Sequence, residues 1–210
     1  MINNNINTEQ RILEAAKQVF MQKGMKVATT QEIADIAGVN KALLHYYFRN
    51  KEKLHLAVFQ DIIKTYLPNL VGIMIARQPL EQRIRAFVSA YIDVLSANSY
   101  LAQFLVHEIQ QNTERFMQQF MHLAPERLIR IVNHSLYKEN IRHITAVDLM
   151  VNMLSLCVFP FIVKPMLNHI IFKDEELMSE RFFLQRKQTV SDFIINSLYY
   201  ENHKTIRHTC

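Results

Sequence analysis

The sequence predicts an all-α protein, with an N-terminal three-helix helix-turn-helix domain followed by a C-terminal helical regulatory and dimerisation bundle. Glycine is rare, with 3 among 210 residues, and 50% of the residues are hydrophobic. Long alternations rich in β-branched residues, which are typical of strands, are few. Apolar residues instead recur at spacings of three and four, as they do on the buried face of a helix.

We place the domain boundary near residue 50, which gives domains 1–50 and 51–210. Nothing between residues 50 and 70 is rich in Gly, Ser or charge, so the sequence predicts no flexible linker. One helix is therefore expected to belong to both domains. Such a helix can carry a movement from one domain to the other.

The first helix is expected to follow a polar tail, residues 1–7, with Asn7 as its N-cap. The dipeptide Lys23-Gly24 would end it. One apolar stripe would pack on the helix-turn-helix. This stripe consists of Ile12, Leu13, Ala16, Val19 and Phe20.

Two short helices and a tight turn are predicted next. Thr29 and Glu32 have the spacing of a capping box, in which the hydroxyl and the carboxylate each accept from a backbone N–H. Gly38 stands where a helix end needs a residue tolerant of positive φ. Asn40 is a good N-cap for the following helix. This spacing is typical of a DNA-binding helix-turn-helix, whose second helix enters the major groove.

The remaining helices are placed by their apolar stripes and by the prolines. Pro68 should end or kink the helix that begins near Asn50, and Pro160 and Pro165 should bend the long apolar helix. The expected helices cover residues 50–66, 80–98, 101–111, 113–123, 126–139, 145–171 and 181–200, with a polar connection at 173–180 and a polar tail at 201–210.

Composition favours a cytoplasmic protein without a membrane segment. Cys157 and Cys210 are the only cysteines, and they lack metal or redox spacing, which fits a reducing compartment. Residues 1–7 lack the plan of a signal peptide. The most apolar run, Leu149–Val163, is shorter than the ~20 residues that cross a bilayer. With a formal charge of +5, the protein is compatible with a polyanion as a partner.

An enzyme is not predicted, and neither is a cofactor or a metal. The sequence contains no G-x-S-x-G, no glycine-rich phosphate loop and no H-E-x-x-H. His107 and Glu108 are adjacent, but neighbours on a helix point to different faces. A pocket-lining polar pair, or plain core and surface residues, fits them better than a hydrolytic or metal site.

The run from Val39 to Leu54, VNKALLHYYFRNKEKL, resembles the signature of the tetracycline-repressor (TetR) family of transcriptional regulators. Upstream residues match in the same register, among them the run RILEAA from Arg11 and the pair Ala37-Gly38. The resemblance covers the first quarter of the chain. Leu43 and His45 depart from the Thr and Tyr that are frequent in the family, so the operator sequence cannot be carried over.

The resemblance implies double-stranded DNA as a partner. Lys41 and Tyr46 should meet bases or nearby phosphates, and Tyr47 and Lys51 should meet phosphates. Helix starts offer backbone N–H groups to a phosphate, and Leu43 can at best contact a thymine methyl. The predicted DNA-binding residues are Thr29, Thr30, Asn40, Lys41, Ala42, Leu43, His45, Tyr46, Tyr47 and Lys51.

The resemblance also implies a pocket for a small-molecule effector in the second domain. Met and Phe recur on its helices and make adaptable walls for apolar ligands, although core packing explains most of them. We expect an apolar or amphipathic ligand within residues 70–170, with His107 as a polar anchor. The predicted pocket residues are Phe87, Tyr91, Phe104, His107, Met117, Phe120 and Met121.

A homodimer is predicted, because two recognition helices related by a two-fold axis can read a palindromic operator. The apolar run Leu149–Val163 and one stripe of the last helix would pair across the axis, unless they are buried within the monomer. That stripe consists of Phe183, Val190, Ile194 and Leu198. The sequence thus predicts a DNA-binding transcriptional regulator, a repressor released from its operator by the effector. The alternative is a helical protein-association module, which the face from Lys41 to Lys51 disfavours.

Overall fold

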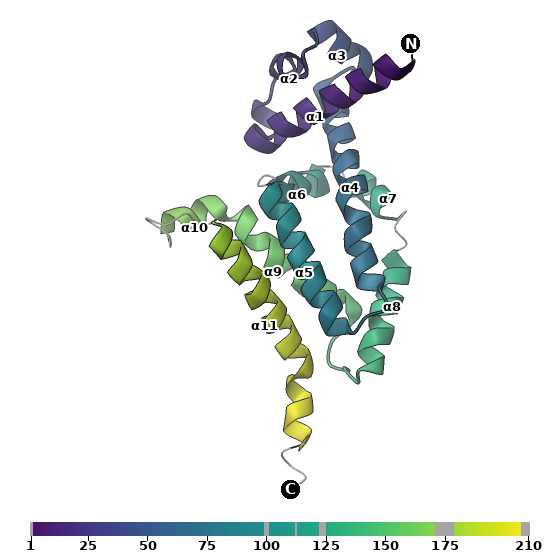
Figure 1. Cartoon of the computed structure of the whole chain (residues 1–210), viewed down its shortest axis with the longest axis vertical. Helices are drawn as coiled ribbons and strands as arrows, with labels where there is room; N and C mark the ends of the chain where they lie inside the picture. Colours follow the sequence, from purple (N-terminus) through teal and green to yellow (C-terminus); the bar gives the residue numbers. More distant parts are fainter. Residues whose placement is uncertain (1, 99–100, 112, 122–124, 171–178, 207–210) are drawn as a thin grey trace. The chain divides into compact units, whose positions relative to one another are not determined.

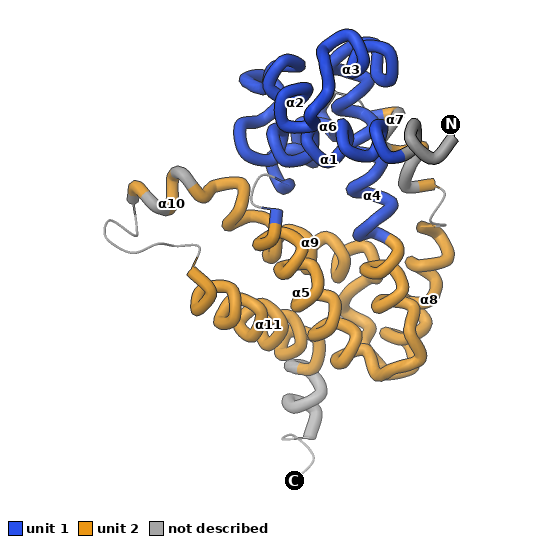
Figure 2. Tube along the Cα trace, turned by 45° about the horizontal axis from the view of Figure 1, so that its top comes forward, with its two compact units in different colours: residues 1–67, 98–113 blue, residues 68–97, 114–210 orange. Residues whose placement is uncertain are grey.

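The computed structural model describes residues 2–98, 101–111, 113–121, 125–170 and 179–206, which form eleven helices and no strand (Figure 1). The predicted all-α fold is confirmed. The chain divides into two compact units (Figure 2): residues 1–67 and 98–113 form unit 1, and residues 68–97 and 114–210 form unit 2. Helix α4 (Lys51–Ile75) contributes to both, and the division falls at Pro68, inside the helix. The functional division into 1–50 and 51–210 stays a prediction.

Unit 1 combines α1 (Ile2–Val27), α2 (Thr30–Ala37), α3 (Lys41–Phe48), the first part of α4 and α6 (Leu101–Gln111). Helix α1 packs against both α2 and α6. Four residues of its predicted stripe are fully buried, whereas Leu13 is half-buried. The buried four are Ile12, Ala16, Val19 and Phe20.

The predicted start of α1 is wrong, whereas a break in the helix lies at its predicted end. Helical backbone begins at Ile2, so residues 2–7 belong to the helix and Asn7 does not cap it. At the other end, Gly24 has φ 75° and ψ 161°, so the regular helix is interrupted where Lys23-Gly24 was predicted to end it. A further helical turn continues to Val27 beyond this kink, whose positive φ glycine adopts without steric cost.

Unit 2 contains the rest of α4, α5 (Leu80–Ala97), most of α7 (Thr113–Met121), α8 (Pro125–Lys138), α9 (Ala146–Ile162), α10 (Lys164–Ile170) and α11 (Glu180–Ile206). Helix α9 packs against α5, α8, α10 and α11, and α5 packs against α11. One hydrophobic core joins them. Its fully buried members include Met74, Leu80, Ile84, Val88, Ile92, Val132, Leu149, Met153 and Cys157.

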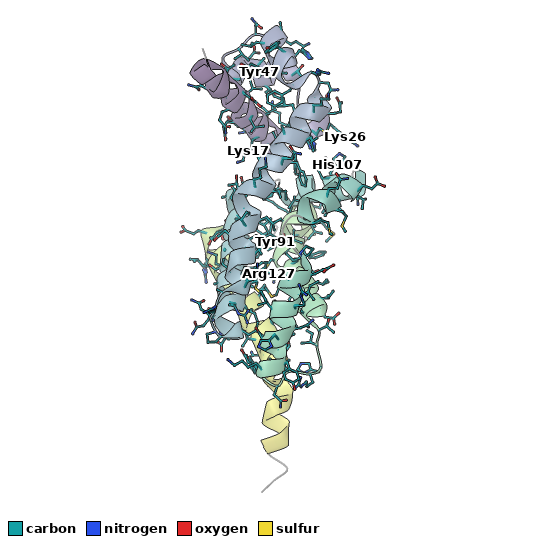
Figure 3. The ribbon with its side chains drawn as sticks, turned by 90° about the vertical axis from the view of Figure 1, so that its right-hand side faces the viewer. Lys17, Lys26, Tyr47, Tyr91, His107 and Arg127 are labelled. Atoms are coloured by element: carbon teal, nitrogen blue, oxygen red, sulfur yellow. The ribbon has the colours of Figure 1, made fainter. Side chains whose placement is uncertain are left out.

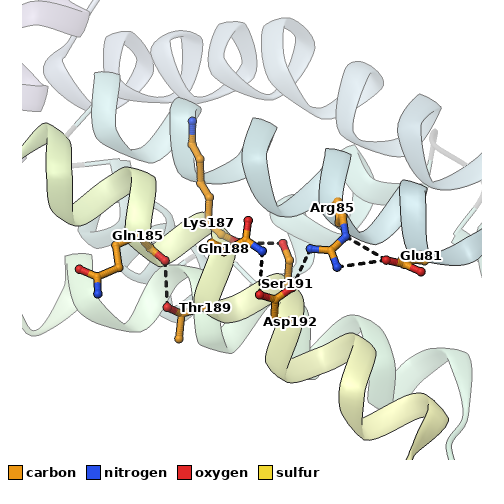
Figure 4. A network of polar contacts seen from close by, with 8 residues as sticks. All are labelled: Glu81, Arg85, Gln185, Lys187, Gln188, Thr189, Ser191 and Asp192. Atoms are coloured by element: carbon orange, nitrogen blue, oxygen red, sulfur yellow. Dashed lines mark hydrogen bonds and ion pairs between the residues drawn. The ribbon is translucent and has the colours of Figure 1, made fainter.

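Polar contacts on the surface connect α5 to α11 (Figure 4). The Arg85 guanidinium donates from NH1 to Asp192 at 2.7 Å and from Nε to Glu81 at 3.1 Å. Gln188 donates to the other oxygen of Asp192 at 2.7 Å. The hydrogen bond from Arg85 is the first cause that lowers the pKa of Asp192. Exposed pairs of this kind contribute little to stability, so the apolar core beneath them determines the packing.

Several helix bounds in unit 2 differ from the prediction. Helix α4 continues through Pro68 to Ile75, and α11 continues to Ile206, where a polar tail was expected from residue 201. The predicted helix 145–171 is two helices, α9 and α10, that meet at Val163. Most of the predicted connection at 173–180 lies outside the described residues.

Many of the side chains predicted to form the dimer interface lie inside the monomer, whereas Val151, Leu154 and Phe159 of the apolar run are exposed. In the stripe of the last helix, Val190, Ile194 and Leu198 are members of the unit 2 core, and Phe183 packs against it. Within the apolar run, the core takes Leu149, Met153 and Cys157. Sequence periodicity finds a buried face but does not tell whether the same chain or a second copy covers it. The large apolar residues exposed on α9 and α11 are Val147, Val151, Leu154, Phe159, Leu184 and Phe193.

Candidate nucleic-acid interface

Helix α3 has one buried and one exposed side. Leu44 and Phe48 are buried in unit 1. The Tyr46 side chain is 77% exposed and the Leu43 side chain 36%, so both can reach a partner outside the protein. The exposed side holds Lys41, Ala42, Leu43, His45 and Tyr46, which are all the predicted DNA-binding residues of this helix except the half-buried Tyr47.

The predicted caps fix the starts of α2 and α3. Thr29 Oγ1 accepts from the Glu32 N–H at 3.2 Å, and Asn40 Oδ1 accepts from the Leu43 N–H at 2.7 Å. Gly38 ends α2 in the left-handed conformation, with φ 63°. Half of the capping box differs, because the Glu32 carboxylate accepts from Lys23 Nζ at 2.5 Å. First-turn N–H groups at both helix starts, near Thr29, Thr30 and Asn40, remain suited to a phosphate.

The two residues predicted to bind phosphates, Lys51 and Tyr47, also make contacts within unit 1. Lys51 Nζ donates to the Ala28 carbonyl at 3.1 Å, so this ammonium ties the start of α4 to the segment before α2. The half-buried Tyr47 ring meets Tyr46 edge to face, with 5.4 Å between the ring centroids. His45, a third candidate for contact with DNA, has its Nδ1 2.9 Å from the Arg49 carbonyl.

Arg11 is a positioning residue that sequence reasoning missed. Its guanidinium donates to the carbonyls of Ala37, at 2.5 Å, and Gly38, at 3.4 Å. These carbonyls lie at the end of α2, where helical partners are lacking. A Cβ on Gly38 would come within 2.7 Å of the Arg11 guanidinium. Arg11 therefore sets the turn between α2 and α3. The sequence signal was a lone Arg next to the buried stripe of α1.

A buried polar pair inside unit 1 was also missed. His55 on α4 and Glu108 on α6 are 3% and 2% exposed, and His55 Nδ1 lies 3.1 Å from Glu108 Oε1. Burial, followed by the nearby His107, lowers the pKa of His55 to about 4. A neutral imidazole that donates from Nδ1 to the carboxylate has an unprotonated Nε2. That nitrogen is buried and has no hydrogen-bond partner among the described residues.

Aromatic rings surround the His55 imidazole. Its centroid lies 4.4 Å from that of Phe104 and 5.3 Å from that of Phe20. The three residues also line a cavity of about 260 Å³ within unit 1. Lys26 and His107, both labelled in Figure 3, line the same cavity. Helix α6 is thus built into the interior of the unit that carries the helix-turn-helix.

The predicted effector residues are divided between the two units. Phe87 and Tyr91 belong to unit 2 and contact each other, with ring centroids 5.8 Å apart, whereas Phe104 and His107 belong to unit 1. The side chains of Met117 and Met121 are more than half exposed. The side chain of Phe120 lies outside the described set. The pocket they were meant to form stays a prediction.

The described residues contain neither a candidate metal site nor a candidate membrane span. Among the described residues, no group of three His, Cys, Asp or Glu side chains is placed to hold a metal ion. Within the same ranges, every helix is too short or too polar to span a membrane.

Known regulatory proteins are similar in sequence to part of this chain. A family profile described as bacterial regulatory proteins, tetR family, matches residues 12–58. The transcriptional activator FasR of Mycolicibacterium smegmatis is 35% identical over 89 residues, which are 42% of this chain and 41% of FasR. In this match the chain spans less than half the length of its relative.

Solved structures resemble the whole chain in fold. A Clostridium perfringens protein described as a fatty acid metabolism regulator has a TM-score of 0.66 and 19% identity, over 89% of this chain and 97% of that chain. The regulator FadR of Bacillus subtilis, solved in complex with stearoyl-CoA, has a TM-score of 0.65 and 14% identity, over 88% and 96% of the two chains. At these identities the likeness concerns the fold.

Proposed function

We propose that this chain, which belongs through its N-terminal domain to the tetR family of bacterial regulatory proteins, is a DNA-binding transcriptional regulator. The observation that carries the proposal is the structure of α3. Its start is capped, one side is buried, and the exposed side presents Lys41, His45 and Tyr46. Such a helix can enter the major groove with its polar face toward the bases. The relatives reported above are all regulators, so a protein-association module has no support from them. The regulator would act in the cytoplasm.

The proposed effector is an apolar or amphipathic small molecule that releases the protein from its operator, so that the bound protein represses. The stearoyl-CoA of the FadR structure is a ligand of this class. Helix α4 supports the mechanism, because residues on either side of Pro68 belong to different units. A ligand that favours one arrangement of unit 2 would bias α4 and with it the recognition helices. A 100-fold release requires a coupling free energy of ~2.7 kcal/mol.

A homodimer is part of the proposal, since a palindromic operator needs two recognition helices about 34–36 Å apart or a multiple of that. Val147, Val151 and Leu154 recur along one face of α9 and are exposed, which supports that face as the contact between two copies. Light scattering should give about twice the chain mass of 24.8 kDa. A V151D variant should give the monomer mass, and a wild-type protein that is folded and monomeric would contradict the dimer.

The test of DNA binding is fluorescence anisotropy with duplex DNA from the region flanking the protein's own coding sequence. The Y46A variant should lose affinity for one specific site and keep its weaker affinity for random DNA, because Tyr46 is free to meet bases. The matched control is Y137A, which removes an exposed tyrosine from α8. If wild-type protein binds every duplex equally, sequence-specific regulation is contradicted. If an effector found by thermal-shift screening binds equally with and without operator, the proposed release is contradicted.

A further inference from the structure

A second and larger cavity, of about 1000 Å³, lies entirely within unit 2. It is bounded by the end of α4, the start of α5 and one side of α8. Apolar residues such as Ile75 and Ile131 form part of its wall. The rest of the wall is dominated by basic side chains, namely Arg77, Arg83, Arg127, Arg130, His134 and Lys138.

The basic residues of α8 share one helix face. Arg127, Arg130, His134 and Lys138 follow each other at spacings of three and four, which places them side by side along the helix. Figure 3 labels Arg127 at this face. Arg127 and Arg130 carry like charges at such a spacing, which repel each other by a few tenths of a kcal/mol. An anion beside this face would relieve that repulsion.

The protein itself supplies little negative charge to this cavity. Glu139 is its one acidic lining residue, and both carboxylate oxygens have partners, the Leu80 N–H at 3.1 Å and the Tyr199 hydroxyl. In the described part of the chain, Arg77, Arg127, Arg130 and Lys138 form neither an ion pair nor a side-chain hydrogen bond. Elsewhere in unit 2, Arg85 pairs with Asp192 and Lys187 pairs with Asp93. The exposed Arg142 and Arg181 form no ion pair within the described residues, so the lack of partners gains its weight in the cavity from the number of cations gathered there.

Arg83 is the buried member of the set. Its side chain lines the cavity although the residue is only 2% exposed. One terminal nitrogen donates to the Met74 carbonyl at 2.7 Å, but the Nε–H has no partner among the described residues. Arginine cannot lose its proton in a protein, so this charge stays buried. Burial lowers the pKa of Arg83, and the charge of Glu139 opposes this shift without reversing it. The cost of burying the guanidinium is therefore only partly compensated within the chain, and a bound anion would compensate it further.

We propose that this cavity binds the phosphate groups of a small organic phosphate, with Arg83 and the basic face of α8 as the binding residues. Guanidinium groups match phosphate oxygens in bidentate geometry, and the apolar part of the wall suits an organic body attached to them. The inference rests on the proposed function, which it deepens by naming a phosphate-bearing effector. Duplex DNA offers the same chemistry, but Arg83 is buried in a cavity and cannot follow a convex duplex.

The experiment is isothermal titration of the full chain with inorganic pyrophosphate, at fixed ionic strength, with sulfate as the comparison anion. Pyrophosphate should bind and sulfate should bind much more weakly. The double variant R127Q/R130Q should bind pyrophosphate at least about tenfold more weakly, because it removes two charged donors. The control R142Q/R181Q removes the same charge from unit 2 outside the cavity and should stay within about twofold of wild type. The R83K variant keeps the charge but removes the Nε–H, and it should also weaken binding.

Four outcomes would overturn the proposal. Pyrophosphate that binds no better than sulfate would show a general effect of charge, as would equal losses in the two double variants. An unchanged affinity in R83K would remove the buried residue on which the inference depends. If R127Q/R130Q weakens duplex DNA as much as pyrophosphate, the face is a nucleic-acid surface. The titration contains no DNA, so a failure of operator binding would contradict the proposed function and leave this site standing.

Discussion

His55 in unit 1 and Arg83 in unit 2 are buried to the same degree, at 3% and 2% exposure, but their environments differ. His55 is neutral, lies between aromatic rings and has the Glu108 carboxylate 3.1 Å from its Nδ1. Arg83 remains a cation, and its one hydrogen bond among the described residues goes to a backbone carbonyl. A group that can lose its proton is buried in its neutral form, whereas Arg83 stays charged and is only partly compensated by the Glu139 carboxylate of the same chain.

The largest expected effect tests the neutral state of His55. Its pKa is lowered from 6.5 to about 4 by burial first and then by His107, while Glu52 opposes and Lys51 adds to the shift. The unfolded chain therefore binds a proton between these pH values that the folded chain does not. The contribution of His55 to the free energy of unfolding should be fully present above pH 6.5. The free energy of unfolding should then fall by up to about 3 kcal/mol as the pH drops toward 4.

Urea unfolding at a series of pH values measures this dependence. Carboxylates titrate in the same range, so the informative quantity is the difference between wild type and H55Q. The glutamine amide is neutral at every pH and can still donate to Glu108. The H55Q variant should lose most of the slope between pH 6.5 and 4. An unchanged slope would show that His55 is not the titrating group.

The next prediction compares two substitutions, one that removes the hydrogen-bond acceptor of His55 and one that removes the charge of Arg83. E108L leaves the His55 Nδ1–H without an acceptor and should lower the free energy of unfolding by about 1–3 kcal/mol. R83M removes a buried charge together with one hydrogen bond to Met74. These effects offset each other, so R83M should change stability by less than about 1 kcal/mol in the absence of an anion. Urea unfolding of both variants at neutral pH measures the difference, with E108Q as the isosteric control.

A large loss in R83M would contradict the view that Arg83 waits for a ligand, because its charge would then already be compensated inside the protein. A loss in E108Q as large as that in E108L would show that the charge of Glu108 matters and not its role as an acceptor. The comparison of the two units depends on both results.

Sequence reasoning reached much further in unit 1 than in unit 2. The caps at Thr29 and Asn40 and the left-handed Gly38 are fixed by interactions within four residues, so their spacing alone predicts them. Arg11 acts on carbonyls 26 and 27 residues away, and no local rule connects them. The same limit hid His55 and Glu108, which come from α4 and α6.

In unit 2 the helical segments were predicted from the sequence, although several of their bounds and the elements that they pack against were not. The stripe of Val190, Ile194 and Leu198 was recognised as buried, yet the structure covers it with α5 and α9 of the same chain. The basic cavity combines residues from the α4–α5 connection with a row on α8 that lies about 50 residues later. Only the row at three- and four-residue spacing was visible in advance, and it could have been taken for a solvated face.

The smallest expected effect separates two kinds of phosphate binding. Lys51 lies at the start of α4 with its ammonium 3.1 Å from the Ala28 carbonyl, close to the turn that carries the recognition helix. If it also meets the DNA backbone, K51A should weaken all duplexes about equally, by about 1 kcal/mol, and lower the salt slope by roughly one unit. Fluorescence anisotropy at several salt concentrations, with operator and random duplexes, measures both quantities.

The R127Q/R130Q variant should leave the slope unchanged, because its cavity is assigned to a small organic phosphate and not to the duplex. A change in sequence preference for K51A at constant slope would contradict its phosphate role, and a lower slope for R127Q/R130Q would place the basic face of α8 on the DNA.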